Sequence, residues 1–111
     1  MITVNDVNSN EEIQVLVKNG QRQLDELGFT EHSVRHNGIV AERAGDVLKE
    51  LGYDETTVEL ARIAGYLHDI GNAVNRNDHA LTGATLSYQI LKDMGMSAEH
   101  AAEVMMAVRK S

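Results

Sequence analysis

Apolar residues recur every three or four positions along most of this chain, which is the period of an amphipathic helix. We find no stretch that alternates apolar and polar residues at a period of two, so we predict no strands. The pattern divides the sequence into about five helices joined by short loops. It predicts an all-α, compact bundle that forms a single domain over residues 1–111, with residues 1–8 as a short N-terminal tail.

The first predicted helix begins at Ser9, because Ser9 and Glu12 have the spacing of a capping box, and Gly28 can close it. Gly20 falls inside this stretch and weakens the prediction of an unbroken helix. The polar side chains in its middle are expected on the solvated surface: Lys18, Gln21, Arg22 and Gln23.

The second predicted helix runs from residue 30 or 31 to residue 51, and Gly52 stops it. His32 and His36 lie four positions apart, so they share one face. His36 is in line with the buried side of the helix, where a histidine is either hydrogen-bonded in the core or a metal ligand. The predicted apolar stripe consists of Val34, Val40, Ala41, Ala44, Val47, Leu48 and Leu51.

The third predicted helix is capped by Asp54 and ends in the sequence Leu67-His68-Asp69. Adjacent residues on a helix point about 100° apart, so His68 and Asp69 can share one ion only if it lies in the angle between them. Gly71 is expected to let the chain turn away. The alternative is a hydrogen-bonded core histidine beside a carboxylate at a helix end.

Two further helices follow a polar loop at residues 72–78. Asp78 is predicted to cap the helix at residues 79–94, and Gly95 to end it. Ser97 is predicted to cap the last helix. The residues expected to face inward from that helix are Ala101, Val104, Met105 and Val108.

The composition narrows the classes of function. A net charge of −7 argues against binding to nucleic acid or to an anionic membrane, both of which need a basic surface. The absence of cysteine excludes disulfides and thiolate metal sites. The chain has no basic segment followed by a long apolar run at its start and no apolar run of about 20 residues, so we expect a cytoplasmic protein without a signal peptide.

Three segments together resemble the HD superfamily of metal-dependent phosphohydrolases. They are His36-x-x-x-Val40-Ala41-x-x-Ala44, then Ala64-Gly65-Tyr66-Leu67-His68-Asp69-Ile70-Gly71, then His79-x-x-x-Gly83-Ala84. The resemblance covers roughly residues 30–94 and implies an all-α fold. In that family a histidine from an early helix, a His-Asp pair and a later aspartate bind a divalent metal. Its members hydrolyse phosphate esters of nucleotides, second messengers and similar compounds, and a few related enzymes use a di-iron site for oxygenation.

The resemblance implies that His36, His68 and Asp69 bind the metal, and that Asp69 also orients the attacking water. His32 is the rival for the first ligand position, because Glu31-His32-Ser33 also resembles the surroundings of that ligand in some members. His79 matches a position that in some members binds a second metal or contacts the substrate phosphate; a surface histidine is the alternative.

Phosphate oxygens need positive or hydrogen-bonding partners, and the candidates near the motif are Arg35, Arg76, His79 and His32. Surface solubility is the alternative explanation for both arginines. Two imidazoles and a carboxylate suit Mn, Fe, Co, Ni or Zn better than Mg, which prefers oxygen ligands. Such an ion lowers the pKa of a bound water and polarises a phosphoryl oxygen.

The sequence departs from the family pattern at the fourth ligand, an aspartate that follows the fifth helix. Glu99 and Glu103 are the carboxylates of the last predicted helix, and Asp78 and Asp93 come too early in the order. We therefore expect a chain truncated at its C-terminal end, or a site completed by water, Glu103 or another chain. Truncation would also uncover apolar surface and favour a homodimer through Met94, Met105, Met106 and Val108.

Three functions follow from these features. The first is a metal-dependent phosphohydrolase whose substrate is a nucleotide or another small phosphate ester. The second is a sensing module that binds a metal or nucleotide without turnover, and the third is a helical interaction domain with hydrogen-bonded core histidines. Metal content separates the third function from the others, and hydrolysis of nucleotides separates the first from the second.

Overall fold

The computed structural model describes residues 1–28 and 33–110, and all regular structure in these ranges is helical. The elements are α1 (Val4–Ser9), α2 (Glu11–Glu26), α3 (Ser33–Glu50), α4 (Glu55–Leu67), the 3₁₀ helix η1 (Ile70–Ala73), α5 (His79–Asp93) and α6 (Ala98–Arg109). The predicted all-α fold class is confirmed, with six α-helices in the described ranges instead of about five.

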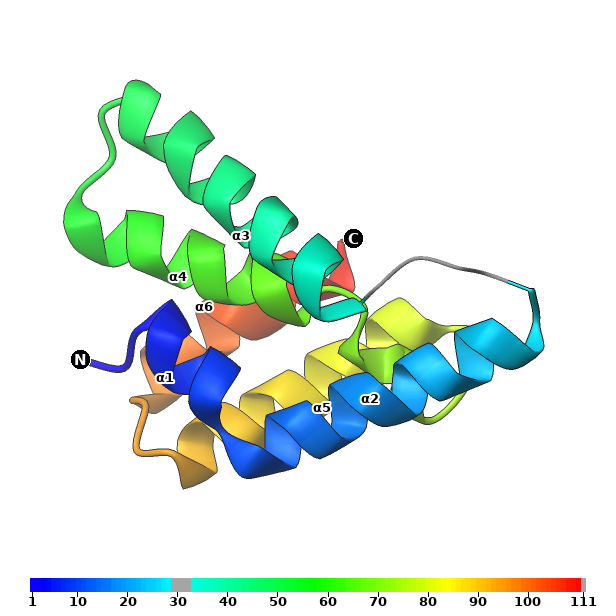
Figure 1. Ribbon diagram of the computed structural model, residues 1–111. Coiled ribbons are helices and arrows are strands. Elements are labelled where there is room, and N and C mark those ends of the chain that lie inside the picture. Colours follow the sequence, from blue (N-terminus) through cyan, green and yellow to red (C-terminus); the bar gives the residue numbers. More distant parts are fainter. Residues whose placement is uncertain (29–32, 111) are drawn as a thin grey trace.

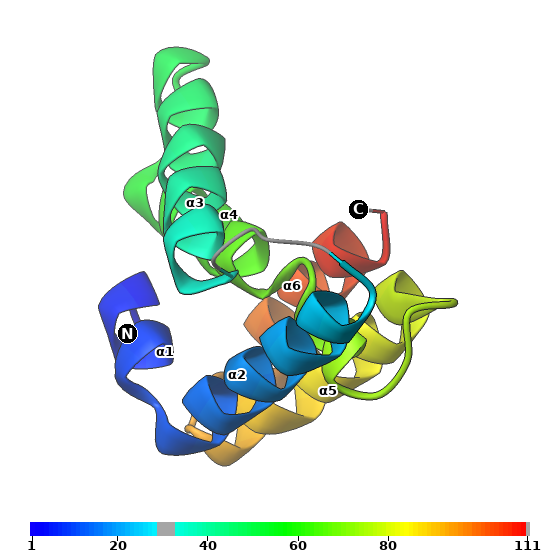
Figure 2. The same cartoon turned by 45° about the vertical axis from the view of Figure 1, so that its right-hand side comes forward.

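Two pairs of helices make up most of the molecule: α3 packs along α4, and α5 packs along α6 (Figure 1). Contacts between α4 and α6 join the pairs, while α2 covers η1 and runs along α5 (Figures 1 and 2). The loop end of the α3–α4 pair projects away from the other helices (Figure 2). Its opposite end, where α4 passes into η1, therefore lies among α2, α3 and α5.

The hydrophobic core is centred on α4, which contacts α1, α3 and α6. Ile63 and Leu67 of α4 and Leu91 of α5 are fully buried. Each such side chain contributes about 1.5–3 kcal/mol relative to an exposed one. Helix α4 is therefore packed against other helices on several sides.

The prediction that the last two helices leave apolar side chains uncovered is largely wrong. Val108 is fully buried, and Met94 and Met105 pack against the core, because α4 covers the inner face of α6. Met106, with 42% of its surface exposed, is the member of the predicted set that lies open to solvent.

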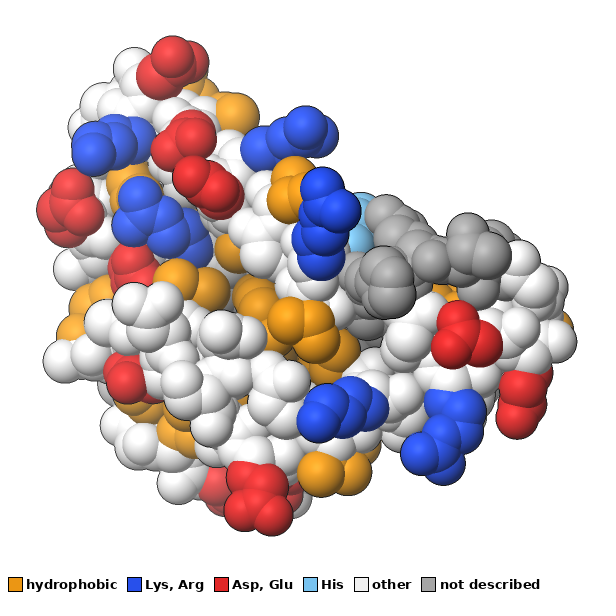
Figure 3. All heavy atoms as spheres, in the orientation of Figure 1, with side chains coloured by type: hydrophobic (Ala, Val, Ile, Leu, Met, Phe, Trp, Pro, Cys, Tyr) orange, Lys and Arg blue, Asp and Glu red, His pale blue; other side chains and the backbone are white. Residues whose placement is uncertain are grey.

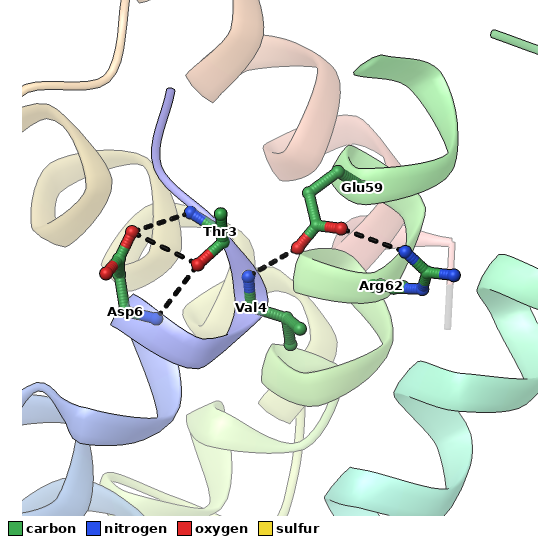
Figure 4. A network of polar contacts seen from close by, with 5 residues as sticks. All are labelled: Thr3, Val4, Asp6, Glu59 and Arg62. Atoms are coloured by element: carbon green, nitrogen blue, oxygen red, sulfur yellow. Dashed lines mark hydrogen bonds and ion pairs between the residues drawn. The ribbon is translucent and has the colours of Figure 1, made fainter. Parts of the chain in front are cut away.

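The N-terminal residues form a helix, so the prediction of a tail over residues 1–8 is wrong. Thr3 and Asp6 make a reciprocal capping box that starts α1, and Val7 is fully buried. The Val4 N–H donates to Glu59 of α4 at 2.6 Å, and Glu59 also pairs with Arg62 at 3.0 Å (Figure 4). These contacts fix α1 on the surface of α4.

The start and middle of α2 differ from the prediction. Asn10, rather than Ser9, caps the helix, because its side chain accepts from the Ile13 N–H at 2.9 Å. Gly20 does not interrupt the helix. Gln23, expected on the solvated surface, donates to the Ala73 carbonyl at 2.8 Å, as Asn19 does. Two amides of α2 thus anchor η1.

The apolar stripe predicted for α3 is too wide. Val34, Val47 and Leu51 are 44%, 56% and 69% exposed, whereas Ala41 is buried. The predicted start of this helix at residue 30 or 31 lies outside the described residues. The narrower observed stripe still places His36 on the side that faces α4.

The predicted caps of the remaining helices have different outcomes. Asp54 and Ser97 cap α4 and α6 as predicted, through the Thr57 and His100 N–H groups. Asp78 precedes α5 but makes no side-chain capping bond, because its backbone is left-handed, with φ at 57°. Gly95 follows α5 with φ at 102°, a conformation that favours glycine.

Candidate metal centre

His36 of α3 meets His68 and Asp69 at the C-terminal end of α4. One potential ligand atom from each of the three lies within 4.8 Å of the others. The two imidazole rings have centroids 5.1 Å apart and are tilted by 58°. All three side chains are partly buried, so the group is sheltered but reachable from solvent. The convergence predicted for His36, His68 and Asp69 is therefore observed.

Gly65 lets α3 and α4 approach closely enough for this group to form. A Cβ atom at position 65 would lie 3.0 Å from the Ala41 Cα and from the Val40 carbonyl oxygen. Both neighbours are backbone atoms, which cannot move without displacing α3. A glycine one turn before His68 thus sets the distance between the two histidines.

The ring of His68 is oriented by the backbone of its own helix. Its Nδ1 lies 2.7 Å from the Gly65 carbonyl oxygen, which can only accept, so Nδ1 carries the proton. Nε2 then faces Asp69, 3.0 Å from Oδ2. Metal-binding histidines commonly donate their second ring nitrogen in this way, which leaves the other as a ligand. Two imidazoles and a carboxylate therefore fit a divalent ion of the Mn-to-Zn series.

Asp69 lies between two histidines. Its Oδ2 faces His68, and its Oδ1 lies 3.3 Å from Nε2 of His79 on α5. The Nδ1 of His79 is 3.2 Å from the Arg76 carbonyl oxygen, so a backbone acceptor orients this ring as well. Burial raises the pKa of Asp69, but the contact with His68 and the positive charges of His68, His79 and His36 in their protonated forms together lower it below its usual value. Asp69 is therefore a carboxylate at neutral pH.

The packing of η1 against α5 brings His79 to this group. A Cβ atom on Gly71 would overlap the His79 carbonyl oxygen, so only glycine permits this contact. The predicted role of Gly71, a turn away from α4, is wrong: Gly71 lies inside η1 and has no positive φ. Its function is to allow close approach of α5.

The structure gives less support to the other predicted site residues. Arg35 and Arg76 are exposed, although the Arg76 carbonyl orients His79. His32, the rival for the first ligand, lies outside the described residues. The carboxylates considered for the fourth ligand do not belong to the observed group within the described ranges; they are Asp78, Asp93, Glu99 and Glu103.

Asn37 and Asn72 were not predicted as parts of the site, yet both are 4% exposed and lie next to it. Position 37 precedes the buried Ala41 by one helical turn, and this spacing could have indicated its burial. Asn72 was expected in a polar loop, and nothing in its local sequence distinguishes it from a solvated turn residue.

Comparison with known proteins identifies the family. The sequence matches the family described as HD domain over residues 29–110. This chain belongs to the HD domain family. The match includes His36, His68 and Asp69, the three residues that converge at the end of α4.

Two curated proteins are similar to this HD domain. One is the uncharacterized protein MJ1020 of Methanocaldococcus jannaschii, 33% identical over 82 residues, which cover 61% of this chain and 32% of that protein. The other is ribonuclease Y of Lawsonia intracellularis, 40% identical over 62 residues, or 53% of this chain and 11% of the ribonuclease. The chain thus spans about a third and about a tenth of these relatives. No solved structure matches.

The surface and helix composition add two observations. On the face drawn in Figure 3, lysine and arginine side chains are interspersed with acidic ones and form no continuous basic area. Within residues 1–28 and 33–110, every helix is too short or too polar to cross a membrane.

Proposed function

We propose that this HD domain is a metal-dependent phosphohydrolase acting on a nucleotide or another small phosphate ester. The observation that carries the proposal is the convergence of His36, His68 and Asp69 from two helices, with potential ligand atoms within 4.8 Å of one another. Family membership supports it, because HD domains are typically metal-dependent phosphohydrolases. A divalent ion in this group would polarise a phosphoryl oxygen and acidify a water.

Some residues of the site would hold the ion, and others would contact the substrate. His36 and His68 would hold the ion through ring nitrogens, and Asp69 would hold it through a carboxylate oxygen. His79 is oriented by the Arg76 carbonyl and lies beside Asp69, and it is the proposed first phosphate contact. The exposed Arg76 side chain is the proposed second phosphate contact.

The substrate class rests on charge. Ribonuclease Y is by its name an enzyme of RNA, and it shares 40% identity with part of this domain. A chain with a net charge of −7 attracts a polyanion poorly, because nucleic-acid binding depends on neutralising many phosphates. The negative net charge of this chain therefore favours a small phosphate ester over RNA as its substrate.

The test is a hydrolysis screen of the purified protein. Nucleoside mono-, di- and triphosphates, cyclic dinucleotides and a short RNA would be assayed with Mn, Co, Ni, Zn and Mg. We expect metal-dependent release of phosphate or nucleotide from a small ester, loss of it in His36→Ala, and retention in His100→Ala, which changes a histidine outside the group. Metal binding without turnover on any substrate would favour the sensing module, and turnover independent of His36 would contradict the proposal.

A further inference from the structure

A small cavity of about 30 Å³ lies beside the metal-ligand group. A cavity of at least about 10–15 Å³ can hold a water molecule, so this one has room for water but none for a nucleotide. It is lined by Leu16, Val17, Gly20, Leu24, His36, Asn37, Asp69, Ile70 and Asn72. The helix α2 thus contributes apolar walls, and the metal centre contributes polar ones.

Two of the lining residues have unsatisfied hydrogen-bonding atoms. Asn37 and Asn72 are each 4% exposed, and the Oδ1 atom of each is buried with no hydrogen-bond partner in the described structure. Buried polar atoms in folded proteins are almost always paired, because an unpaired one keeps the full cost of its dehydration. Both atoms are acceptors, so the group that satisfies them must be a donor.

A water molecule can donate one hydrogen to each of two acceptors and still has lone pairs left over. If it donates one hydrogen to Asn37 and the other to Asn72, its oxygen is free to meet a positive charge. His36 and Asp69, which line the same cavity, are two of the three residues that would hold the ion. A water molecule in this cavity would therefore meet two requirements: it can donate to the asparagine oxygens, and it lies next to residues that would hold the ion.

We propose that this cavity holds a water molecule that is bound by Asn37 and Asn72 and completes the ligand shell of the ion. The inference rests on the proposed metal site and assigns a role to two residues outside it. It also accounts for the fourth position, since no further carboxylate of the described residues joins His36, His68 and Asp69. Asn37 and Asn72 are then positioning residues, which act on the ion through the water.

The test measures metal binding, independently of turnover. Asn37→Leu, Asn72→Leu and the double variant would be titrated with Mn²⁺ and Zn²⁺, and their Co²⁺ forms examined by visible absorption. We expect each single variant to bind metal about 10-fold more weakly, as is typical when a partner of a ligand is removed. The double variant should bind no more weakly than either single one, because both lose the same water. The Co²⁺ spectrum should intensify as the number of ligands falls.

Asn19→Leu is the matched control. Asn19 is an amide that anchors η1 from α2 through the Ala73 carbonyl, but it does not line the cavity. The metal affinity of the Asn19→Leu variant should be unchanged. This result would distinguish loss of the water from loosening of η1. Thermal unfolding without metal would verify that each variant folds, and alanine variants would replace any leucine variant that does not.

Three results would overturn the inference. They are wild-type metal affinity in both single variants, losses that add in the double variant, and an unchanged Co²⁺ spectrum. Absence of metal binding by the wild-type protein would overturn the proposed function together with this inference. Normal metal affinity in the asparagine variants would overturn the water site alone.

Discussion

Backbone carbonyls decide which nitrogen His68 and His79 present to Asp69. The Gly65 carbonyl engages Nδ1 of His68, and the Arg76 carbonyl lies near Nδ1 of His79, so Nε2 of both rings faces the carboxylate. These acceptors belong to the same helix or the preceding turn. The orientation is thus local, whereas the meeting with His36 depends on how α3 packs against α4.

Removal of one ligand tests the roles at the residue scale. His68→Ala should weaken metal binding by more than about 100-fold, because even an indirect partner of a ligand is worth 10- to 100-fold. Arg76→Ala should leave metal binding unchanged and weaken the binding of inorganic phosphate by about 10-fold, the effect of one charge-assisted contact. Titration calorimetry with Mn²⁺, then with phosphate, would measure both. Equal loss of metal in the two variants would contradict these assignments.

At the residue scale, the convergence of His36, His68 and Asp69 was expected from the resemblance to the HD superfamily. The adjacency of His68 and Asp69 and the position of His36 on a buried helical face, taken alone, left a hydrogen-bonded core histidine open as the alternative. The burial of Asn72 depends on α2 covering η1, a contact between segments about 50 residues apart. Local sequence carries little information about such a contact.

At the scale of elements, the close contact of α3 and α4 at Gly65 is the feature on which the site depends. Gly65→Ala should lower the melting temperature and weaken metal binding, because its Cβ would press on the backbone of α3 at 3.0 Å and separate His36 from His68. Thermal unfolding and metal titration would measure the two effects.

Gly38→Ala is the matched control for that change. Gly38 also lies in α3, but a Cβ there meets nothing within 4 Å, so alanine should stabilise the helix by about 0.5–1 kcal/mol and leave metal binding intact. If Gly65→Ala behaved like Gly38→Ala, the close approach would not be the element that sets the ligand distance.

The start of α4 predicts a dependence of stability on pH. The Thr57 backbone and side chain lower the pKa of Asp54 from its usual 3.8. A carboxyl group with a lowered folded-state pKa stabilises the protein above its unfolded pKa, and that contribution disappears as the pH falls through the folded value. Asp54→Asn, which caps without a charge, should match the wild type near neutral pH and lose less stability by pH 3. Urea unfolding from pH 7 to pH 3 would measure this, and parallel losses in both proteins would contradict it.

Helix boundaries were predicted well where caps and glycines are unambiguous, as at Asp54, Ser97 and Gly95. Errors arose where two capping residues compete, as with Ser9 and Asn10. At Gly71 the sequence indicates a helix stop, but the structure needs glycine there because α5 approaches too closely for a side chain. Tertiary contact, rather than local preference, decided that position.

For the whole molecule, α1 is an integral part of the fold. Val7 is fully buried, so Val7→Ala should destabilise the protein by about 2 kcal/mol through lost burial and the space left behind. Val15→Ala, at a position 60% exposed on α2, should change stability by less than about 0.5 kcal/mol. Chemical denaturation would compare them, and equal effects would show that α1 does not contribute to the core.

The homodimer expected from the sequence stays a prediction. The apolar face on which that expectation rested is mostly covered within one molecule. Val108 is buried within one molecule, and Met94 and Met105 pack against the same core. The sequence indicated that these residues are apolar and periodic, but which neighbour covers them depends on the arrangement of α4 and α6. Light scattering on the purified chain would establish the oligomeric state.

The central claim is that one divalent ion binds between α3 and the end of α4. Anomalous scattering from a crystal of the protein soaked in Mn²⁺ or Co²⁺ would test it most directly. The account predicts a peak at roughly 2.0–2.3 Å from a ring nitrogen of His36, Nε2 of His68 and a carboxylate oxygen of Asp69. A fully occupied peak elsewhere, or none at this group with His68 still bonded to Asp69, would contradict it.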